Sequence, residues 1–347
     1  MAPYDRIGQA SLADKGIKPL GLPNFRSFRM PLQVTLAFVK GFLRFSRMPE
    51  VRVTHLIGVG TILVFGPWFW FSKRPFVCAI AGLGSIFSSA AKPSKLRSLV
   101  TNLFCRTLSR PGCHIIIQNE KDRDVLLNLQ IPSAKITKIR GSGVPESRFK
   151  NQRVRNQNET KIILMPARLI REKGIYDAFD IAEALGKIVS FPFELLIAGP
   201  LDTGNPKAIS ASEYEGLKQR DHRVRFLGEI DDLDPFYMSA DVVIQPSCYN
   251  EGLPKVIIEA FASQTPVVSY PNPGSEEIVE DGKTGFLVKK GEFDVFAQKI
   301  ADLLTQPDLH EAISDNAYQS FLKNFTTEAV VEAHRKIYEK LVKVYNA

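Results

Sequence analysis

The sequence predicts an α/β protein made of two doubly wound, Rossmann-like domains that face a cleft. Its 347 residues exceed the roughly 250–300 residues at which a single hydrophobic core stops growing. In the second half, short apolar strands alternate with amphipathic helices, a pattern typical of a parallel sheet covered by helices. The first half is less regular but contains apolar runs of the same kind. A composition of 44% hydrophobic and 24% charged residues is that of an ordinary globular protein.

The second half supplies the clearest elements. Six short apolar runs predict strands at 162–165, 194–198, 224–227, 242–245, 266–269 and 285–288. Amphipathic spacing predicts helices at 175–188, 235–239, 254–262 and 293–304, and a terminal helix at about 327–345. Six strands alternating with helices are enough for a complete doubly wound domain.

The first half contains three further apolar runs, a long apolar stretch and a basic amphipathic segment. The runs predict strands at 53–57, 76–80 and 114–118, and the basic segment covers residues 32–45. The stretch 56–71 is shorter than the roughly 20 residues needed to span a bilayer. It also contains three glycines and Pro67. We therefore expect buried strand and helix there. No secretory leader is indicated at the start of the chain.

Charge is concentrated in the first half. Residues 1–150 hold 23 Lys and Arg against 7 Asp and Glu, whereas the remainder holds 22 against 30. A basic domain can contact nucleic acid or anionic lipid, or can simply be a solvated face. No nucleic-acid-binding motif is present, so we expect no nucleic-acid partner. The four cysteines, Cys78, Cys105, Cys113 and Cys248, form no Cys-x-x-Cys pair. They predict neither a disulfide framework nor a zinc site, and a reducing cytoplasm fits best.

The strongest chemical motif covers residues 250–259, Asn-Glu-Gly-Leu-Pro-Lys-Val-Ile-Ile-Glu. Pro254 suits the first turn of a helix, where its missing N–H is no loss. The free amides near Gly252 and Leu253 then point along the helix axis and favour an anion. A carboxylate on the loop, Glu251, can hold sugar hydroxyls, and Glu259 on the helix can reach a ribose diol.

A second motif directly follows the predicted strand 162–165. Residues 167–174 read Ala-Arg-Leu-Ile-Arg-Glu-Lys-Gly and place Arg168 and Lys173 five residues apart. At the carboxyl end of a strand in an open sheet, such cations are positioned to neutralise a leaving diphosphate. Alone the motif is also compatible with a basic solvated loop. Upstream of the Glu-x7-Glu motif it predicts a diphosphate site.

With these motifs, residues 161–345 resemble the donor-binding domain of family 4 retaining glycosyltransferases, which have the GT-B fold. The segments Gly-Pro-Leu-Asp-x-x-Asn-Pro at 199–206 and Gln-Pro-Ser-x-Tyr-Asn-Glu-Gly-Leu-Pro at 245–254 resemble enzymes that extend undecaprenyl-diphosphate-linked saccharides, including N-acetylgalactosaminyltransferases. Segments 81–84, 118–124 and 141–144 resemble the same subgroup. The resemblance covers nearly the whole chain.

The resemblance implies a role for each matching residue. Arg168 and Lys173 would bind the donor diphosphate and Glu251 the donor sugar, and these three are the expected catalytic residues. Donor-binding residues would be Gly199, Leu227, Gly228, Glu229, Ile230, Gly252, Leu253, Pro254 and Glu259, with 227–230 holding the base and Glu259 the ribose. Gly82, Gly84 and Asn119 would lie on the acceptor side. No metal or cofactor is expected beyond the nucleotide-sugar donor, which the resemblance implies is UDP-linked.

The expected domains are an acceptor-side domain at 1–149, a polar linker at 150–160, a nucleotide-sugar domain at 161–326 and a helix at 327–347 that packs back toward the first domain. The start of the chain resembles the end of the family's second strand, so we expect the first domain to lack its opening strand-loop-helix unit. Asn250 and the segment 274–277 depart from the subgroup, which leaves the donor sugar open.

Two other signals favour structural roles. Asp232 and Asp234 resemble the Asp-x-Asp metal motif of other glycosyltransferases, but they precede Pro235 and a short helix, where Asp is a favoured cap. His55 ends an apolar strand and could face the cleft, yet a lone histidine there is more often structural.

The expected function is sugar transfer, with retention, from a UDP-sugar to a polyprenyl-diphosphate-linked saccharide or related glycan. The protein would act peripherally at the inner face of the plasma membrane, where its basic domain and residues 68–71, Trp-Phe-Trp-Phe, could contact anionic lipid. The same aromatics could equally belong to the core. The alternative is a catalytically silent homologue that binds nucleotide sugar and serves as an assembly partner.

Overall fold

The computed structural model describes residues 53–72, 74–80, 82–83, 94–149, 159–202, 204–249 and 252–346. These residues divide into two compact units. Unit 1 holds the described residues up to Ile116, together with Val125–Thr137 and those from Ile337 onward, and unit 2 comprises Ile117–Asp124 and Lys138–Lys336. The basic segment 32–45 and nearly all of the expected linker lie outside the described residues. The predicted domain boundaries remain a prediction.

Unit 2 contains a six-stranded sheet, and every strand pair given for it is parallel. Its strand order is β10-β9-β8-β5-β6-β7. The strands are β5 (Lys161–Pro166), β6 (Phe193–Ala198), β7 (Val224–Gly228), β8 (Val242–Gln245), β9 (Val267–Ser269) and β10 (Phe286–Leu287). All six predicted strands are therefore present. The chain leaves β5 in one direction and returns to its other side at β8, so the strand order reverses between these two strands.

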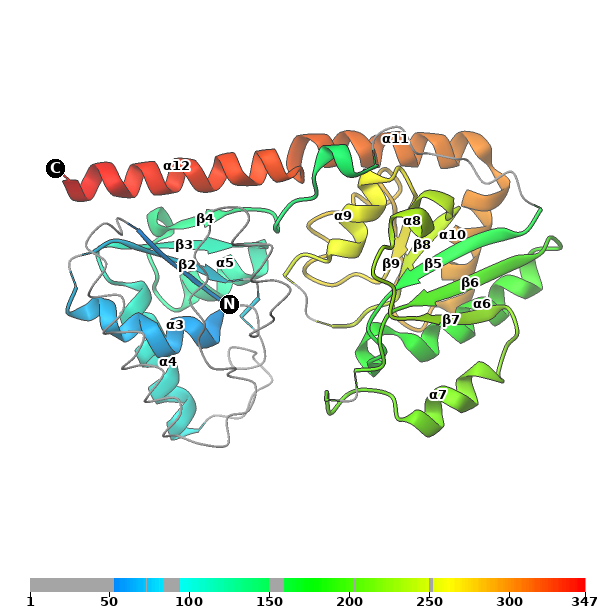
Figure 1. Cartoon of the computed structure of the whole chain (residues 1–347), viewed down its shortest axis with the longest axis horizontal. Coiled ribbons are helices and arrows are strands. Elements are labelled where there is room, and N and C mark those ends of the chain that lie inside the picture. The colour runs from blue at the N-terminus through cyan, green and yellow to red at the C-terminus, as the bar shows by residue number, and fades with distance from the viewer. Residues whose placement is uncertain are drawn as a thin grey trace. The chain divides into compact units, whose positions relative to one another are not determined.

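Helices cover both faces of this sheet (Figure 1). One face packs against α6 (Ile175–Ile188) and α10 (Phe293–Thr305), and the other against α8 (Asp234–Ser239), α9 (Lys255–Ala262) and part of α11 (Pro307–Asn324). The strands alternate accordingly: Ile163 and Met165 of β5 belong to the first core, and Leu164 to the second. This period of two is what a sheet buried on both sides requires.

Two helices of unit 2 were not predicted from the sequence. α7 (Ala211–Lys218) begins with a capping box, in which Ser210 and Glu213 each satisfy the other's backbone N–H. α11 begins with Pro307 in its first turn, where proline is tolerated because its missing N–H would have no intrahelical partner. A capping box thus marks the start of α7 and a first-turn proline that of α11, two helices whose apolar pattern is weak.

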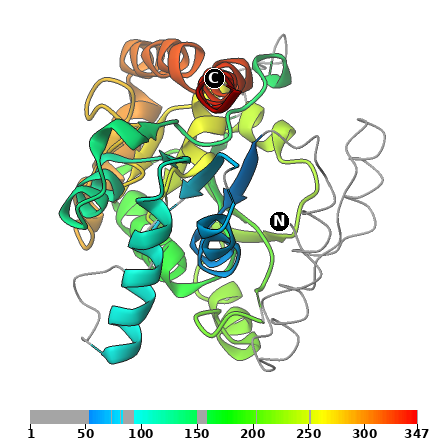
Figure 2. The ribbon, with the colours of Figure 1, turned by 90° about the vertical axis from the view of Figure 1, so that its left-hand side faces the viewer.

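The second sheet has the strand order β1-β2-β3-β4. Its strands are β1 (Thr54–Ile57), β2 (Phe76–Ile80), β3 (Cys113–Ile117) and β4 (Ile136–Lys138), and β1 pairs parallel with β2. The remaining helices are α3 (Val59–Phe65), α4 (Lys95–Leu108), α5 (Glu120–Asn128) and α12 (Thr327–Asn346), with short 3-10 turns η1 (Gly66–Trp70), η3 (Ser133–Lys135), η4 (Glu146–Phe149) and η5 (Arg171–Lys173). Figure 2 shows α3 in blue and α4 in cyan.

The apolar stretch 56–71 forms the end of β1, α3 and η1, as predicted. Trp68 and Phe69 are buried, whereas Phe71 is 91% exposed. The aromatic run therefore divides into two core residues, the half-buried Trp70 and the exposed Phe71. Within the described residues, no helix combines the length and apolar character needed to cross a membrane.

Both histidines of the four-stranded sheet, His55 in β1 and His114 in β3, contact neighbouring polar groups. His55 Nδ1 lies 2.7 Å from the Tyr338 hydroxyl of α12, and the two rings meet edge to face. This contact favours the structural interpretation of His55. His114 of β3 is buried, and its Nε2 lies 2.9 Å from Thr137 Oγ1.

The environment of His114 predicts a pH dependence of stability. Burial, reinforced by the charge of Lys340, lowers the pKa of His114. Below its ordinary pKa of about 6.5, the unfolded chain therefore binds a proton that the folded chain resists. The contribution to the free energy of unfolding is fully present above that pH and declines as the pH falls through it. His114→Gln should weaken the dependence of the melting temperature on pH between pH 7 and 5. If the melting temperatures of the variant and the wild type change with pH in the same way, the prediction is contradicted.

Candidate functional site

The site lies at the carboxyl ends of β5 and β8, where the strand order of the large sheet reverses. In open α/β sheets, ligands bind in the crevice outside the strands at such a reversal. The loop after β5 carries Arg168 and Lys173, and the loop after β8 leads to Gly252 and α9. Both predicted motifs thus come to the same edge of one sheet.

Arg168 is held above this edge by backbone bonds between consecutive strand ends. The N–H of Ala167 donates to the carbonyl of Ala198, and that of Leu169 donates to the carbonyl of Pro200. The guanidinium Nη1 of Arg168 lies 2.8 Å from Asp202 Oδ2, and the Arg168 side chain is 45% exposed. Because an exposed ion pair contributes little net free energy, the guanidinium can exchange this carboxylate for an anionic ligand. Asp202 was not predicted as its partner.

Lys173 lies at the end of η5, next to the loop that follows β8. The N–H of Cys248 donates to the carbonyl of Glu172 at 2.9 Å, which joins the two loops. The ammonium of Lys173 lies 5.6 Å from the ring centroid of Tyr249. Its neighbours are engaged elsewhere, since Arg171 pairs with Glu213 and Glu172 pairs with Lys207. The turn therefore presents Lys173 to the loop after β8.

Two glycines let these loops approach closely. Gly174 has φ +78°, and a Cβ there would lie 2.0 Å from the carbonyl oxygen of Pro246. A Cβ on Gly199 would lie 2.0 Å from the carbonyl oxygen of Ala167. No side chain fits at either distance. Gly199, predicted as a donor-binding residue, therefore also sets the spacing between the β5 and β6 loops.

The amino end of α9 points its first amides out of the helix. Gly252 and Pro254 are buried, Leu253 is half-buried, and Pro254 is the N-cap, so the helix begins one residue later than predicted. Among the residues that the structure describes, no side chain caps the helix. The N–H of Ile257 donates to the carbonyl of the N-cap residue Pro254, and the N–H groups before it have no acceptor within the helix. The carbonyl of Gly252 accepts a hydrogen bond from Asn119 Nδ2 at 3.2 Å. Asn119, expected on the acceptor side, therefore holds the backbone of the loop that precedes α9.

The segment predicted to hold the base, residues 227–230, comprises the last two residues of β7 and the two that follow it. Gly228 has φ +72°, a left-handed conformation, and its carbonyl accepts the N–H of Gly199 at 2.8 Å. Glu229 is exposed, whereas Leu227 and Ile230 pack partly against the core beneath α8 and α9. The loop is thus joined to the Gly199 loop at the same edge of the sheet.

Glu259 is 8% exposed, and both of its carboxylate oxygens have protein partners. Oε1 accepts from Arg148 Nη1 at 2.6 Å, and Oε2 accepts from the Tyr237 hydroxyl at 3.0 Å. Arg148 also binds Asp234. The sequence predicted none of Arg148, Asp234 or Tyr237 as site residues, because nothing in their local pattern signals the pairing.

Some predicted residues cannot be placed. Glu251 and Gly84 lie outside the described residues, so their roles stay predictions. Gly82 follows β2 in unit 1 and has φ +138°. The carboxylates of the Asp-x-Asp segment have partners within the protein: Asp232 Oδ1 accepts the N–H of Asp234 at 3.0 Å, and Asp234 binds Arg148. The N-cap of α8 is Leu233, so neither aspartate is the cap that was expected.

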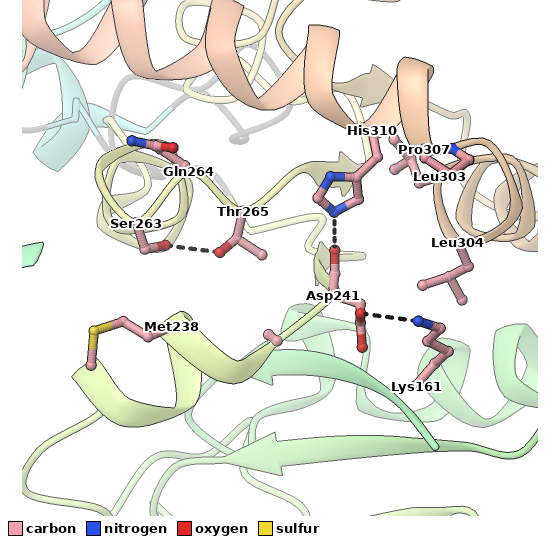
Figure 3. Close-up of a pocket in the computed structure, with 11 residues that line it drawn as sticks. Lys161, Met238, Asp241, Ser263, Gln264, Thr265, Leu303, Leu304, Pro307 and His310 are labelled. Carbon is pink, nitrogen blue, oxygen red and sulfur yellow. Dashed lines mark hydrogen bonds and ion pairs between the residues drawn. The ribbon is translucent and has the colours of Figure 1, made fainter. Parts of the chain in front are cut away.

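A separate cavity of about 170 Å³ lies near the amino ends of β5 and β8, opposite the candidate site (Figure 3). It adjoins Lys161, which begins β5, and Asp241, which precedes β8. The His310 Nε2 lies 3.0 Å from the carbonyl oxygen of Asp241, and Ser263 pairs with Thr265. Its polar groups largely satisfy one another, and it is not part of the predicted site.

Two cations and an uncapped helix start thus lie along one edge of a sheet in unit 2. Positive charge and free amides at a helix start stabilise phosphate groups, and positioned cations stabilise charge that develops on a leaving group. The arrangement can therefore bind a diphosphate and assist its departure.

Cys248 offers a chemical probe of this edge. It is exposed, whereas Cys78 and Cys113 are buried and Cys105 is intermediate. We expect a thiol-alkylating reagent to modify Cys248 first, and a bound nucleotide diphosphate to slow that modification severalfold by covering the loop. Mass spectrometry of the modified peptides checks this, with Cys105 as the internal control. Equal alkylation of Cys248 with and without nucleotide would contradict the placement.

The architecture, two parallel-sheet α/β domains, is that of the GT-B fold, and solved structures share it. A glycosyltransferase from Rickettsia africae superposes with a TM-score of 0.76 at 19% identity, over 96% of this chain and 87% of the other. Anabaena Alr3699/HepE in complex with UDP and glucose gives a TM-score of 0.76 at 17% identity, over 97% of this chain and 90% of the other.

Residues 146–320 match the family model "Glycosyl transferases group 1", and the chain belongs to this family. The capsular polysaccharide biosynthesis glycosyltransferase CapM of Staphylococcus aureus is 30% identical over 188 residues, which is 54% of this chain and 48% of CapM. The N,N'-diacetylbacillosaminyl-diphospho-undecaprenol alpha-1,3-N-acetylgalactosaminyltransferase of Campylobacter jejuni is 26% identical over 78% of this chain and 72% of that protein. The chain thus spans about half the length of CapM and more of the second relative.

Proposed function

We propose that the chain is a retaining, metal-independent hexosyltransferase that moves a sugar from a UDP-sugar, with an N-acetylhexosamine as the first candidate, to a polyprenyl-diphosphate-linked saccharide. Its product would enter a surface polysaccharide such as a capsule or O-antigen. The observation that carries the proposal is the placement of Arg168, Lys173 and the start of α9 after the carboxyl ends of β5 and β8, where the strand order reverses.

The proposed reaction uses these groups on the leaving diphosphate. The bond between the anomeric carbon and the phosphate oxygen breaks, and a bond to the acceptor oxygen forms on the same face of the sugar. The acceptor's proton passes to the departing phosphate oxygen. Arg168, Lys173 and the α9 amides stabilise the negative charge that develops on the diphosphate. Glu251 would orient the sugar rather than attack it.

Relatives support both the donor and the acceptor class. The Campylobacter relative is named for N-acetylgalactosamine transfer to an undecaprenyl-diphosphate-linked sugar, and CapM for capsular polysaccharide biosynthesis. The structural neighbour Alr3699/HepE has been solved with UDP and glucose and with UDP-glucose. A UDP-sugar and a lipid-linked saccharide are therefore the substrates to test first.

A lipid-linked acceptor requires access to the membrane, and unit 1 has features that suit it. Leu96 and Leu99 of α4 are 71% and 65% exposed. They are three residues apart and so share a helix face, and Lys95 and Arg97 lie beside them in the sequence. Exposed apolar side chains among cations favour anionic lipid at the inner face of the plasma membrane. Binding to anionic vesicles that weakens with salt supports this, and indifference to lipid charge would contradict it.

The test is to incubate the chain with separate UDP- and GDP-linked sugars and a polyprenyl-diphosphate-linked saccharide, and to follow nucleotide release with and without a metal chelator. We expect acceptor-dependent release of UDP from one sugar and no loss of rate with the chelator. Binding of UDP without any transfer would instead favour the silent assembly partner. Acceptor-dependent release of GDP alone would contradict the proposed donor.

A further inference from the structure

Arg148 connects two carboxylates that lie on different helices. Its Nε and Nη2 donate to Asp234 Oδ1 at 2.8 and 2.5 Å, and its Nη1 donates to Glu259 Oε1 at 2.6 Å. The two acids raise the pKa of Arg148, and the hydrogen bonds that it donates to Asp234 act most strongly. A planar guanidinium can serve two carboxylates in this fixed geometry, whereas a lysine ammonium cannot reproduce its fork.

Tyr237 fixes the other side of the same carboxylate. Its hydroxyl donates to Glu259 Oε2 at 3.0 Å from a fully buried position, and burial raises its pKa well above the ordinary value, so it stays a donor. Phe149 packs edge to face on Tyr237, with ring centroids 6.1 Å apart. The side chain of Glu259 is therefore held from both sides in one orientation.

This orientation leaves Glu259 able to accept further hydrogen bonds. An ionised carboxylate has about four acceptor positions, and Arg148 and Tyr237 each occupy one. Lys255 contributes an ion pair at 3.4 Å. Asp234 begins α8, shortly after the 227–230 loop, and Glu259 lies in α9, shortly after Gly252. Arg148 thus joins the two helices that follow the predicted base and phosphate segments.

We propose that Arg148 is a positioning residue for nucleotide recognition: by clamping Glu259, it makes the site select a ribose over a 2′-deoxyribose. The inference rests on the proposed UDP-sugar function. A hydroxyl gains most from a charged acceptor that is already oriented, and a site built for that hydroxyl rejects a nucleotide lacking it. Arg148 acts through Glu259 and need not touch the nucleotide.

The test compares the affinities of UDP and 2′-deoxy-UDP by titration calorimetry. In the wild-type chain we expect UDP to bind about tenfold or more tightly, as a hydrogen bond to a charged group implies. In Arg148→Gln the affinities for UDP and 2′-deoxy-UDP should differ by no more than about twofold. Arg148→Lys should give a ratio of affinities between those of the wild type and Arg148→Gln. Arg220→Gln, which removes an exposed pair with Asp180, is the control and should keep the wild-type ratio.

Asp234→Asn provides a second variant if Arg148→Gln fails to fold. It weakens the anchor of Arg148 without removing any charge from Glu259, and it should lower the ratio in the same direction. If the variants bind both nucleotides more weakly but keep the wild-type ratio, Arg148 is only structural and the inference is overturned. If the wild-type chain binds UDP tightly but binds 2′-deoxy-UDP equally well, the inference alone is overturned. If the wild-type chain does not bind UDP at all, the proposed function is overturned as well.

Discussion

Lys173→Ala should lower the turnover of sugar transfer on the order of 10²-fold, by analogy with other oriented stabilisers of developing charge. In the proposed reaction, the diphosphate gains negative charge as the glycosidic bond to it breaks. Lys173 is fixed near the loop after β8 by the η5 turn and by the bond from Cys248 to Glu172. Steady-state release of UDP from the preferred donor, with acceptor present, measures the effect.

Arg171→Ala is the matched control for this change. It removes the same charge two residues away, but the guanidinium of Arg171 is engaged with Glu213, so turnover should stay within about threefold of the wild type. A general electrostatic effect on an anionic substrate would lower the turnover of both variants by a similar factor. Near-normal turnover in Lys173→Ala would remove Lys173 from the mechanism.

Gly174→Ala should have the largest effect on folding. A left-handed conformation costs a residue with a Cβ about 1–2 kcal/mol, and here the added atom would also lie 2.0 Å from the carbonyl oxygen of Pro246. Because that neighbour is backbone, the loops after β5 and β8 must separate. We expect the free energy of unfolding to fall by about 3 kcal/mol or more, at the upper end of the range for single substitutions. Chemical denaturation followed by circular dichroism measures it.

Gly282→Ala separates the two contributions to this loss. Gly282 has φ +72°, close to that of Gly174, but nothing lies within 4 Å of its added Cβ. It should therefore lose only the cost of the left-handed conformation, about 1–2 kcal/mol. Equal losses in the two variants would show that the close approach to Pro246 contributes nothing.

The sequence predicted most of the fold of unit 2 because buried parallel strands are short, apolar and regularly spaced. All six strands were located, and α6 at Ile175–Ile188 matches its prediction. α7 and α11 were missed because their apolar patterns are weak, and only a capping box at α7 and a first-turn proline at α11 mark where they begin. β4, with three residues, is too short to stand out from a loop.

The candidate site could be predicted where its residues lie next to a strand end, and it could not be predicted where it depends on pairing between residues far apart in the sequence. Arg168 and Lys173 follow β5 directly, so the rule that ligands bind at strand carboxyl ends places them. Arg148 reaches Asp234 and Glu259 across 86 and 111 positions of the sequence. No local pattern reports such a contact. The same is true of Asn119, which supports Gly252 from 133 positions away.

The binding of a donor diphosphate by the loops after β5 and β8 is tested most directly by a crystal structure of the chain with UDP. We expect the two phosphates within hydrogen-bonding distance of the Arg168 guanidinium, the Lys173 ammonium and the first amides of α9, with the uracil beside residues 227–230. A structure in which UDP lies elsewhere, with Arg168 still on Asp202 and Lys173 away from the phosphates, would contradict the assignment.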